Sequence, residues 1–302
     1  MWRIETRRKL DDREFATVGR LLAEAESYDG FHPLSDHLLL DLEDHGGQSF
    51  VAVLAYGETG SLDGYAQLTS ANSSSAMELV VAPAERAWAD ELTSQLLRVA
   101  MEVVAADGGG RINWWVHRPG DRTQLIAEGV GLKLGRRLLQ MRRSLPIDVP
   151  GTVDTRSFVV GCDEMEWLRV NNAAFLDHPE QGGWTIETLR RREVEPWFDP
   201  EGFRLHERGG KLAAFCWTKV HSDTVPPMGE IYVIAVDPAF HGLGLGKSLT
   251  IAGLEHLAAR GLTTGMLHVD ADNAAAMSLY ERLGFTVHHA DHAYLAEINS
   301  TR

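Results

Sequence analysis

The sequence predicts an α/β protein made of two tandem units, each with a mixed, mostly antiparallel sheet flanked by helices. The first observation is length, because 302 residues are enough for two domains of ordinary size. The second is the stretch Leu145–Gly151, whose two prolines and one glycine are typical of a linker. The third is that the same order of expected elements occurs on both sides of this linker. We therefore expect one domain over residues 1–145 and another over residues 152–302.

The expected elements of the second half follow from its hydrophobic patterning. Residues 204–217 indicate a strand, a glycine turn and a second strand, and residues 229–236 indicate a β-branched strand. Leu249, Gly253 and Leu257 recur at a spacing of four, which is typical of a helix that packs along one face. This half is therefore expected to contain helices, an antiparallel meander and a strand–helix–strand–helix unit.

The first half repeats this order. Residues 50–54 and 64–68 indicate two strands around a glycine-containing turn, and residues 77–83 indicate a third strand that ends in proline. Residues 92–105 predict the helix that follows. Two copies of one plan in tandem indicate duplication of an ancestral domain.

Composition excludes several classes of partner. Acidic residues outnumber basic ones by 43 to 29, and the net charge is −14. Nucleic acids and anionic membrane surfaces attract basic patches, so we expect neither as a partner. No apolar run has the length of a membrane span, and the first residues lack the apolar core of a signal peptide. We expect a cytoplasmic monomer.

Neither the cysteines nor the histidines indicate a metal or a disulfide framework. Cys162 and Cys216 lie far apart in the sequence and have no metal-ligand spacing. His288, His289 and His292 cluster near the C-terminus without a carboxylate or cysteine at ligand spacing, so we expect no metal site.

The stretch VDPAFHGLGLGKSL, residues 236–249, raises the question of a phosphate-binding loop. Its Gly-Lys-Ser ending matches a nucleotide-binding P-loop, but the first glycine of that motif would fall at position 241, which is His241. The alternative is a cradle in which alternating glycines turn backbone N–H groups toward a pyrophosphate at the start of a helix. From these residues alone, a tight turn without a ligand is equally possible.

A second motif decides between these possibilities. Residues 273–285 have the pattern N-x-x-A-x-x-L-Y-x-x-x-G-F, and they follow a strand expected at residues 266–269. Together with the glycine loop, this pattern resembles the GNAT family of acyl-CoA N-acyltransferases. The resemblance implies a fold of two tandem GNAT domains and acetyl-CoA as the cosubstrate. One departure is His241, where the family usually has Gln or Arg.

The resemblance also implies a set of cofactor-binding residues. The strand backbone would pair with the pantetheine arm, the loop would hold the pyrophosphate, and the next helix would begin beside the cofactor. The residues are Ile234, Ala235 and Val236 on the strand, His241, Gly242, Leu243, Gly244, Leu245, Gly246 and Lys247 in the loop, and Asn273, Ala274, Ala275, Ala276, Met277 and Ser278 at the helix start. A plain helix N-cap is an equally good interpretation of Asn273.

Acyl transfer to an amine needs a base and an acid. Glu230, at the start of the strand, is expected to take the proton of the amine, directly or through water. Tyr280 stands where the family commonly has the tyrosine that protonates the leaving thiolate. The alternatives are an exposed strand-edge glutamate and a core tyrosine. Neither cysteine lies in a motif for a covalent intermediate, so we expect direct transfer.

A longer resemblance concerns the acceptor. LRVNNAAFLDHPEQGGWT at residues 168–185, WFDPEGFRL at residues 197–205 and FCWTKVH at residues 215–221 are similar to the mycothiol synthase family. That family acetylates the cysteinyl amine of a cysteine–glucosamine–inositol conjugate, which is the last step of mycothiol biosynthesis. The acceptor residues that this resemblance implies are Asp36, Glu180, Lys219, Glu230 and His268.

Some of these acceptor residues have plainer interpretations. At the position of His268 the family often has a tyrosine. Lys219 could instead be an ordinary surface lysine, and Asp36 could be a solvated residue at a helix start. Two other functions also stay open from sequence. One is a tandem GNAT enzyme for a different small amine, such as an aminoglycoside or an amino acid. The other is a non-catalytic acetyl-CoA-binding protein.

The first half is expected to carry a degenerate acyl-CoA loop. Aligning Pro83 with Pro238 places residues 86–91, RAWADE, against the glycine loop, so that acidic side chains replace the backbone cradle. Aligning the glycines that end both motifs places Ala127 against Tyr280. We expect this half to lack catalysis, and its strand at residues 79–81 leaves weak acetyl-CoA binding open.

Overall fold

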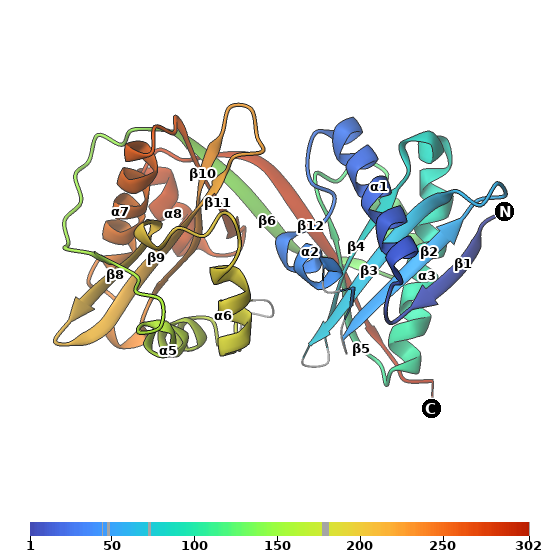
Figure 1. Ribbon diagram of the computed structural model, residues 1–302, viewed down its shortest axis with the longest axis horizontal. Coiled ribbons are helices and arrows are strands. Elements are labelled where there is room, and N and C mark those ends of the chain that lie inside the picture. Colours follow the sequence, from blue (N-terminus) through green and yellow to red (C-terminus); the bar gives the residue numbers. More distant parts are fainter. Residues whose placement is uncertain (44, 47–48, 72–73, 177–180, 302) are drawn as a thin grey trace. The chain divides into compact units, whose positions relative to one another are not determined.

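The protein forms two compact units in the computed structural model, which describes residues 1–301 except 44, 47–48, 72–73 and 177–180. Unit 1 comprises Met1–Leu138 and Ala290–Arg302, and unit 2 comprises Leu139–His289. Both units are α/β, as the sequence predicts (Figure 1). No described helix combines the length and the apolar character that crossing a membrane requires.

Unit 1 is a sheet with helices on both faces. Its elements are β1 (Arg3–Arg7), α1 (Asp12–Asp29), α2 (Asp36–Glu43), β2 (Phe50–Tyr56), β3 (Leu62–Ala71), β4 (Ser74–Val81), η1 (Pro83–Trp88), α3 (Ala89–Ala106), β5 (Gly110–Val116), α4 (Thr123–Gly129), the start of β6 (Lys133–Ser144) and the end of β12 (Thr286–Ile298). From β1 to β5 the strands lie in chain order, and only the β4–β5 pair is parallel. Apolar residues of α1 and α2 fill one core and those of α3 fill the other.

Unit 2 repeats this plan. Its elements are the end of β6, β7 (Arg156–Ser157), α5 (Glu164–Ala174), α6 (Ile186–Glu193), η2 (Pro200–Gly202), β8 (Phe203–Arg208), β9 (Lys211–His221), β10 (Met228–Val236), η3 (Pro238–Phe240), α7 (Leu245–Ala259), β11 (Thr264–Asp270), α8 (Ala274–Arg282) and the start of β12. The strand order is β12-β6-β11-β10-β9-β8-β7. One core lies under α7 and α8, and the other is an aromatic cluster under α5.

The compact units do not follow the linear division that the sequence analysis expects. In unit 1 the neighbour of β5 is the end of β12, whose residues His292–Ile298 pair antiparallel with β5. In unit 2 the neighbour of β11 is the end of β6, from Leu139 onward. Each unit therefore takes one strand of its sheet from the other half of the sequence. Periodicity identifies these strands but carries no information about which sheet each one joins.

A buried charge network connects three segments of unit 1. The imidazole of His117 lies with Nε2 3.5 Å from Glu78 Oε1 and Nδ1 3.3 Å from Asp291 Oδ2. The amide of Ser35 donates to Glu78 at 2.6 Å, and the amide of Arg118 donates to Asp291 at 3.0 Å. Burial opposes the charged imidazole, but Asp291 and Glu78 outweigh it and raise the pKa of His117 to about 10. The network therefore holds β4 (Glu78), the end of β5 and β12 (Asp291) together through a charged histidine.

Replacing His117 with leucine should destabilise unit 1 strongly, because two buried carboxylates lose their cation. Breaking a buried pair in this way costs about 3–5 kcal/mol of unfolding free energy. Since the folded pKa of His117 lies above its ordinary 6.5, its contribution is present below pH 6.5 and lost as the pH rises toward 10. Denaturant unfolding at several pH values measures both effects.

Arg111 provides the matched control, because its ion pair with Glu297 joins the same two strands at 2.7 Å with both side chains more than half exposed. Arg111→Gln should cost less than about 1 kcal/mol. Equal losses in the two variants would contradict the role given to the buried network.

Candidate active site

Strand β10 contains a bulge next to Glu230. Its register with β9 runs from Ile231 opposite Thr218 directly to Val233 opposite Trp217, so Tyr232 is the extra residue. A bulge of this kind leaves its extra residue unpaired and bends the strand. Tyr232 and Val233 consequently pack against the same aromatic core. The bulge thus separates the part of β10 that carries Glu230 from the part expected to face the cofactor.

Beyond this bulge, β10 and β11 part. Their parallel pairing ends at Ile231 and Leu267, although β10 continues to Val236 and β11 to Asp270. Residues 234–236 stay paired with β9 on one edge. Among the described residues, their other edge has no strand partner. An opening of this kind offers backbone N–H and C=O groups to an extended, amide-containing ligand.

The glycine loop lies at the C-terminal end of this opening. Gly242 and Gly244 have φ angles of 79° and 73°, a conformation that residues with a Cβ rarely adopt, and Gly244 is the N-cap of α7. Both glycines are exposed. The first turn of a helix presents unpaired N–H groups and a partial positive charge, which together favour an anion. The exposed Lys247 in this turn adds a full charge.

His241 has a role in the loop that its position in the motif does not reveal. Its Nε2 lies 3.1 Å from the carbonyl oxygen of Val236 at the end of β10. The side chain therefore fastens the loop to the strand, and it leaves the anion to the backbone N–H groups and Lys247. This contact gives a physical reason for a histidine where the family usually has Gln or Arg.

The polar residues of the site share one face of the sheet. Successive side chains of a strand alternate between faces, so Lys219 and His221 of β9 lie on the same side. Glu230 is opposite Lys219 in the β9–β10 register and opposite Met266 in the β10–β11 register, which places it on that side. His268 follows Met266 on β11 by two residues, so its side chain lies on that side as well. The strands thus bring four chemically active side chains from three segments to one face.

Glu230 is the centre of this group. It is only 7% exposed, which rules out the exposed strand-edge glutamate considered above. His221 Nε2 lies 2.8 Å from its Oε2, and His268 Nδ1 lies 3.0 Å from its Oε1. Burial opposes ionisation, but the two imidazoles outweigh it and hold the pKa of Glu230 far below its usual range. The carboxylate is therefore ionised at neutral pH.

Lys219 is buried and not a surface lysine. It is 7% exposed, and its Nζ lies 4.7 Å from the ring centre of Trp197 and 5.6 Å from that of Tyr232. Cations over aromatic faces are stabilised by the ring quadrupole. The lysine thus places a positive charge beside Glu230 on a face that also offers aromatic surface, which suits a polar ligand with hydroxyl groups.

Tyr280 lies on the other face of the sheet, in the core under α7 and α8. It is 7% exposed, and its ring meets that of Phe285 edge-on, so packing is part of its role. Burial raises the pKa of Tyr280 to about 12, which keeps the phenol protonated at neutral pH. A protonated hydroxyl is what an acid for the leaving thiolate requires. The described contacts do not join Tyr280 to Glu230.

The other predicted residues have varied outcomes. Asn273 is the N-cap of α8, and its side chain accepts a hydrogen bond from the Ala276 amide at 3.1 Å. Asp36 is the first residue of α2 and belongs to unit 1, whereas Glu230 belongs to unit 2. Glu180 lies outside the described residues. The cap of Asn273 is thus confirmed, and the acceptor roles of Asp36 and Glu180 stay predictions.

The network around Glu230 also includes His221, Gln140 and Arg142, which no sequence motif indicates. The alternation of Lys219 and His221 along β9 could have indicated the first of these. Gln140 and Arg142 lie on β6, and their approach depends on the strand exchange, so the sequence holds no local signal for them.

The described residues form no cluster of metal-ligating side chains, and one of the two cysteines is buried. Within the described parts of the chain, no three His, Cys, Asp or Glu side chains gather as a metal site would require. Cys216 is fully buried, and burial raises the pKa of its thiol to about 12, so it is not a nucleophile at neutral pH.

The fold is a tandem GNAT fold. The model of the acetyltransferase (GNAT) family matches residues 167–285. A tandem GNAT protein from the clavulanic acid biosynthesis pathway superposes with a TM-score of 0.68 at 15% identity, covering 99% of this chain and 100% of that one. A GCN5-related N-acetyltransferase from Sphaerobacter thermophilus superposes with a TM-score of 0.66 at 22% identity, covering 98% and 96% of the two chains.

Sequence similarity narrows the class further. The mycothiol acetyltransferase of Streptomyces coelicolor is 42% identical over 302 residues, covering 97% of this chain and 95% of that protein. The protein of the same name from Streptomyces avermitilis is 44% identical with the same coverage. The mycothiol acetyltransferase of Thermomonospora curvata is 42% identical, and the alignment covers 94% of each chain. The chain belongs to the mycothiol acetyltransferase family of GNAT enzymes.

The glycine loop gives a matched pair of variants. Gly244→Ala forces a side chain into the left-handed region, which costs roughly 1–2 kcal/mol even though a Cβ there would meet nothing within 4 Å. Gly246 lies inside α7, and a Cβ there would make ordinary contacts at 3.8 Å or more. Gly246→Ala should therefore leave the unfolding free energy unchanged or raise it slightly. Denaturant titration measures both, and equal stability of the two variants would contradict the loop conformation.

Proposed function

We propose that this chain transfers the acetyl group of acetyl-CoA to the cysteinyl amine of a cysteine–glucosamine–inositol conjugate, the final step of mycothiol synthesis. The observation that carries the proposal is the ionised, buried Glu230 at the point where β10 leaves β11. It stands beside the opening that an acyl-CoA would enter. The names of the relatives support the identity of the product.

The cofactor would lie along the opening between β10 and β11. The backbone of Ile234, Ala235 and Val236 would pair with the amides of pantetheine. The loop residues from His241 to Lys247 would enclose the pyrophosphate through backbone N–H groups. The first turn of α8, residues 274–278, would flank the cofactor, with Asn273 fixing that turn as its cap.

The acceptor would approach the face that carries Lys219, Glu230 and His268. A sugar–inositol acceptor presents many hydroxyl groups, which charged side chains bind through short hydrogen bonds. Lys219 and Glu230 provide opposite charges as cross-strand neighbours. Asp36 and Glu180 are proposed as further acceptor contacts on the strength of the family resemblance.

The reaction requires two protons to move. The acceptor amine is an ammonium ion in neutral water and must lose a proton before its nitrogen can attack the thioester carbon, and Glu230 supplies the negative charge that drives this loss. A backbone N–H near Ile234 would stabilise the oxyanion that forms. Tyr280 would protonate the thiolate as the carbon–sulfur bond breaks, because its hydroxyl is protonated at neutral pH.

Unit 1 is proposed to be non-catalytic. Its β4–β5 pairing ends at Met77 and Trp114, and a cavity of about 510 Å³ lies between residues 79–81 and 114–118. The loop that follows β4 instead forms the 3₁₀ helix η1, without a glycine. Ala127, at the position matched with Tyr280, is buried in the core and carries no hydroxyl. Unit 1 thus has an opening like that of unit 2 but neither the cradle nor the acid.

The purified protein should acetylate the cysteine–glucosamine–inositol conjugate with release of one CoA per product. CoA release and product mass would be followed together, with glucosamine and an aminoglycoside as competing amines. In parallel, Glu230→Gln should lower kcat by about 10²–10⁴-fold, the usual size of a proton-transfer contribution. Turnover of an unrelated amine but not of the conjugate would overturn the proposed acceptor, and an unchanged rate in Glu230→Gln would overturn the role of the carboxylate.

A further inference from the structure

The two imidazoles at Glu230 differ in what their outer nitrogens contact. Arg142 Nε donates to Gln140 Oε1 at 2.8 Å, which leaves the amide nitrogen of Gln140 facing His268 Nε2 at 3.3 Å. An amide nitrogen can only donate, so His268 Nε2 is the acceptor and its ring proton is on Nδ1. That Nδ1 lies 3.0 Å from Glu230. Arg142 thereby fixes the direction of every hydrogen bond from β6 to the carboxylate.

These hydrogen bonds disfavour a proton on the outer nitrogen of His268. Protonation at Nε2 would turn that nitrogen into a donor facing the donor amide of Gln140. Rotating the amide does not help, because its nitrogen would then face Arg142, which also only donates. The hydrogen bonds therefore favour a His268 whose Nδ1 donates to Glu230.

His221 has the opposite character. Its Nε2 lies 2.8 Å from Glu230 Oε2, and because the carboxylate is ionised this nitrogen carries the proton. The lone pair is then on Nδ1, which makes no hydrogen bond to the residues that the structure describes. The side chain is 17% exposed, so water can reach it. A buried carboxylate on one nitrogen and an open lone pair on the other is the arrangement that makes histidine a general base in catalytic triads.

Glu230 itself is poorly suited to keep a proton. A carboxylate that two imidazoles hold ionised forms a strong acid when it is protonated, whereas a base works best when its pKa is near the operating pH. An imidazole is the side chain most often used as a general base. Among the described residues, the charged groups around His221 include Lys219 on its own strand, Glu230 on β10, and Arg142 on β6 acting through Gln140 and His268.

We propose that His221 is the general base of the transfer and that its Nδ1 takes the proton of the acceptor's ammonium group, directly or through one water. The proposal rests on the proposed function. The amine then attacks the thioester carbon, the carbon–sulfur bond breaks, and its electron pair stays on sulfur. Tyr280 protonates the thiolate, and the proton lost by the new amide nitrogen restores Tyr280. The imidazolium of His221 returns its proton to water, so the reaction releases one proton overall.

The test compares His221→Gln with a matched histidine. Glutamine can still donate to Glu230 but has no titratable nitrogen. We expect kcat to fall by about 10²–10⁴-fold, with the KM for acetyl-CoA nearly unchanged. The acid limb of the wild-type kcat–pH profile should be replaced by a rise that follows the fraction of neutral amine. His268→Gln should keep the acid limb, because its outer nitrogen takes no proton.

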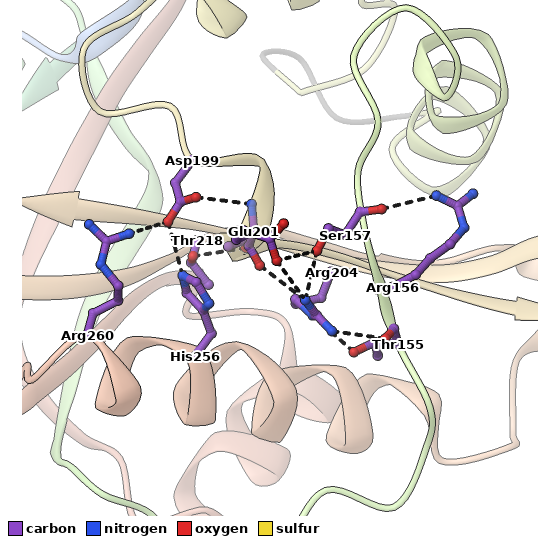
Figure 2. Close-up of polar contacts among 10 residues, drawn as sticks. Thr155, Arg156, Ser157, Asp199, Glu201, Arg204, Thr218, His256 and Arg260 are labelled. Atoms are coloured by element: carbon purple, nitrogen blue, oxygen red, sulfur yellow. Dashed lines mark hydrogen bonds and ion pairs between the residues drawn. The ribbon is translucent and has the colours of Figure 1, made fainter.

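His256 supplies the control. Its Nε2 lies 3.2 Å from Asp199 Oδ2 and its side chain is 16% exposed, which closely matches His221, but Asp199 also pairs with Arg260 (Figure 2). It lies in the last turn of α7, at the opposite end of that helix from the glycine loop. His256→Gln should leave kcat and the pH profile as in the wild type. An equal fall of kcat in His256→Gln and His221→Gln would show that losing any histidine–carboxylate pair lowers the rate. That result would overturn the proposal.

A second variant separates chemistry from structure. His221→Ala should regain activity on addition of imidazole, in proportion to the neutral imidazole present, while His221→Gln should not. No rescue of a His221→Ala variant that still binds acetyl-CoA, or a wild-type pH profile in His221→Gln, would overturn the proposal. If the wild type does not acetylate the conjugate, the proposed acceptor is wrong, and the same variants assayed on the amine that it does acetylate decide the role of His221.

Discussion

The active unit is organised around one buried negative charge. A carboxylate with little exposure costs several kcal/mol of free energy unless donors replace the water it loses. Glu230 receives these donors from His221 on β9 and His268 on β11, which places it between two neighbouring strands. The positions of the three strands are therefore constrained by the same contacts that keep the carboxylate ionised.

The backbone next to Glu230 meets a second requirement, an opening for a ligand. The bulge at Tyr232 and the end of the β10–β11 pairing come directly after the residues that hold the charge. The charged face and the unpaired edge of β10 are thus adjacent, and they are formed by different residues of the strand. The glycine loop, fastened to the end of β10 by His241, lies at the far end of that edge. The residues of β10 would therefore face the pantetheine arm, and the loop that follows them in the sequence would face the pyrophosphate.

Much of this could be predicted from the sequence, because the signals are local. The glycine loop leads into α7, as expected, and Asn273 is the N-cap of α8. The helix expected at residues 92–105 lies within α3. What the sequence could not provide are contacts between strands that are distant along the chain. The exchange of β6 and β12 and the link from Arg142 through Gln140 to His268 are of this kind. The contacts of His268 with Glu230 and Gln140 are likewise not indicated by its residue type.

The proposed chemistry depends most directly on the state of the Glu230 carboxylate in the folded enzyme. A ¹³C-carboxyl NMR titration of the protein, with the Glu230 resonance assigned by its absence in Glu230→Gln, measures this state. The account predicts that Glu230 stays ionised well below the ordinary carboxyl pKa of 4.5, down to the pH at which the protein unfolds. A resonance that titrates near or above 4.5 in the folded protein would contradict it.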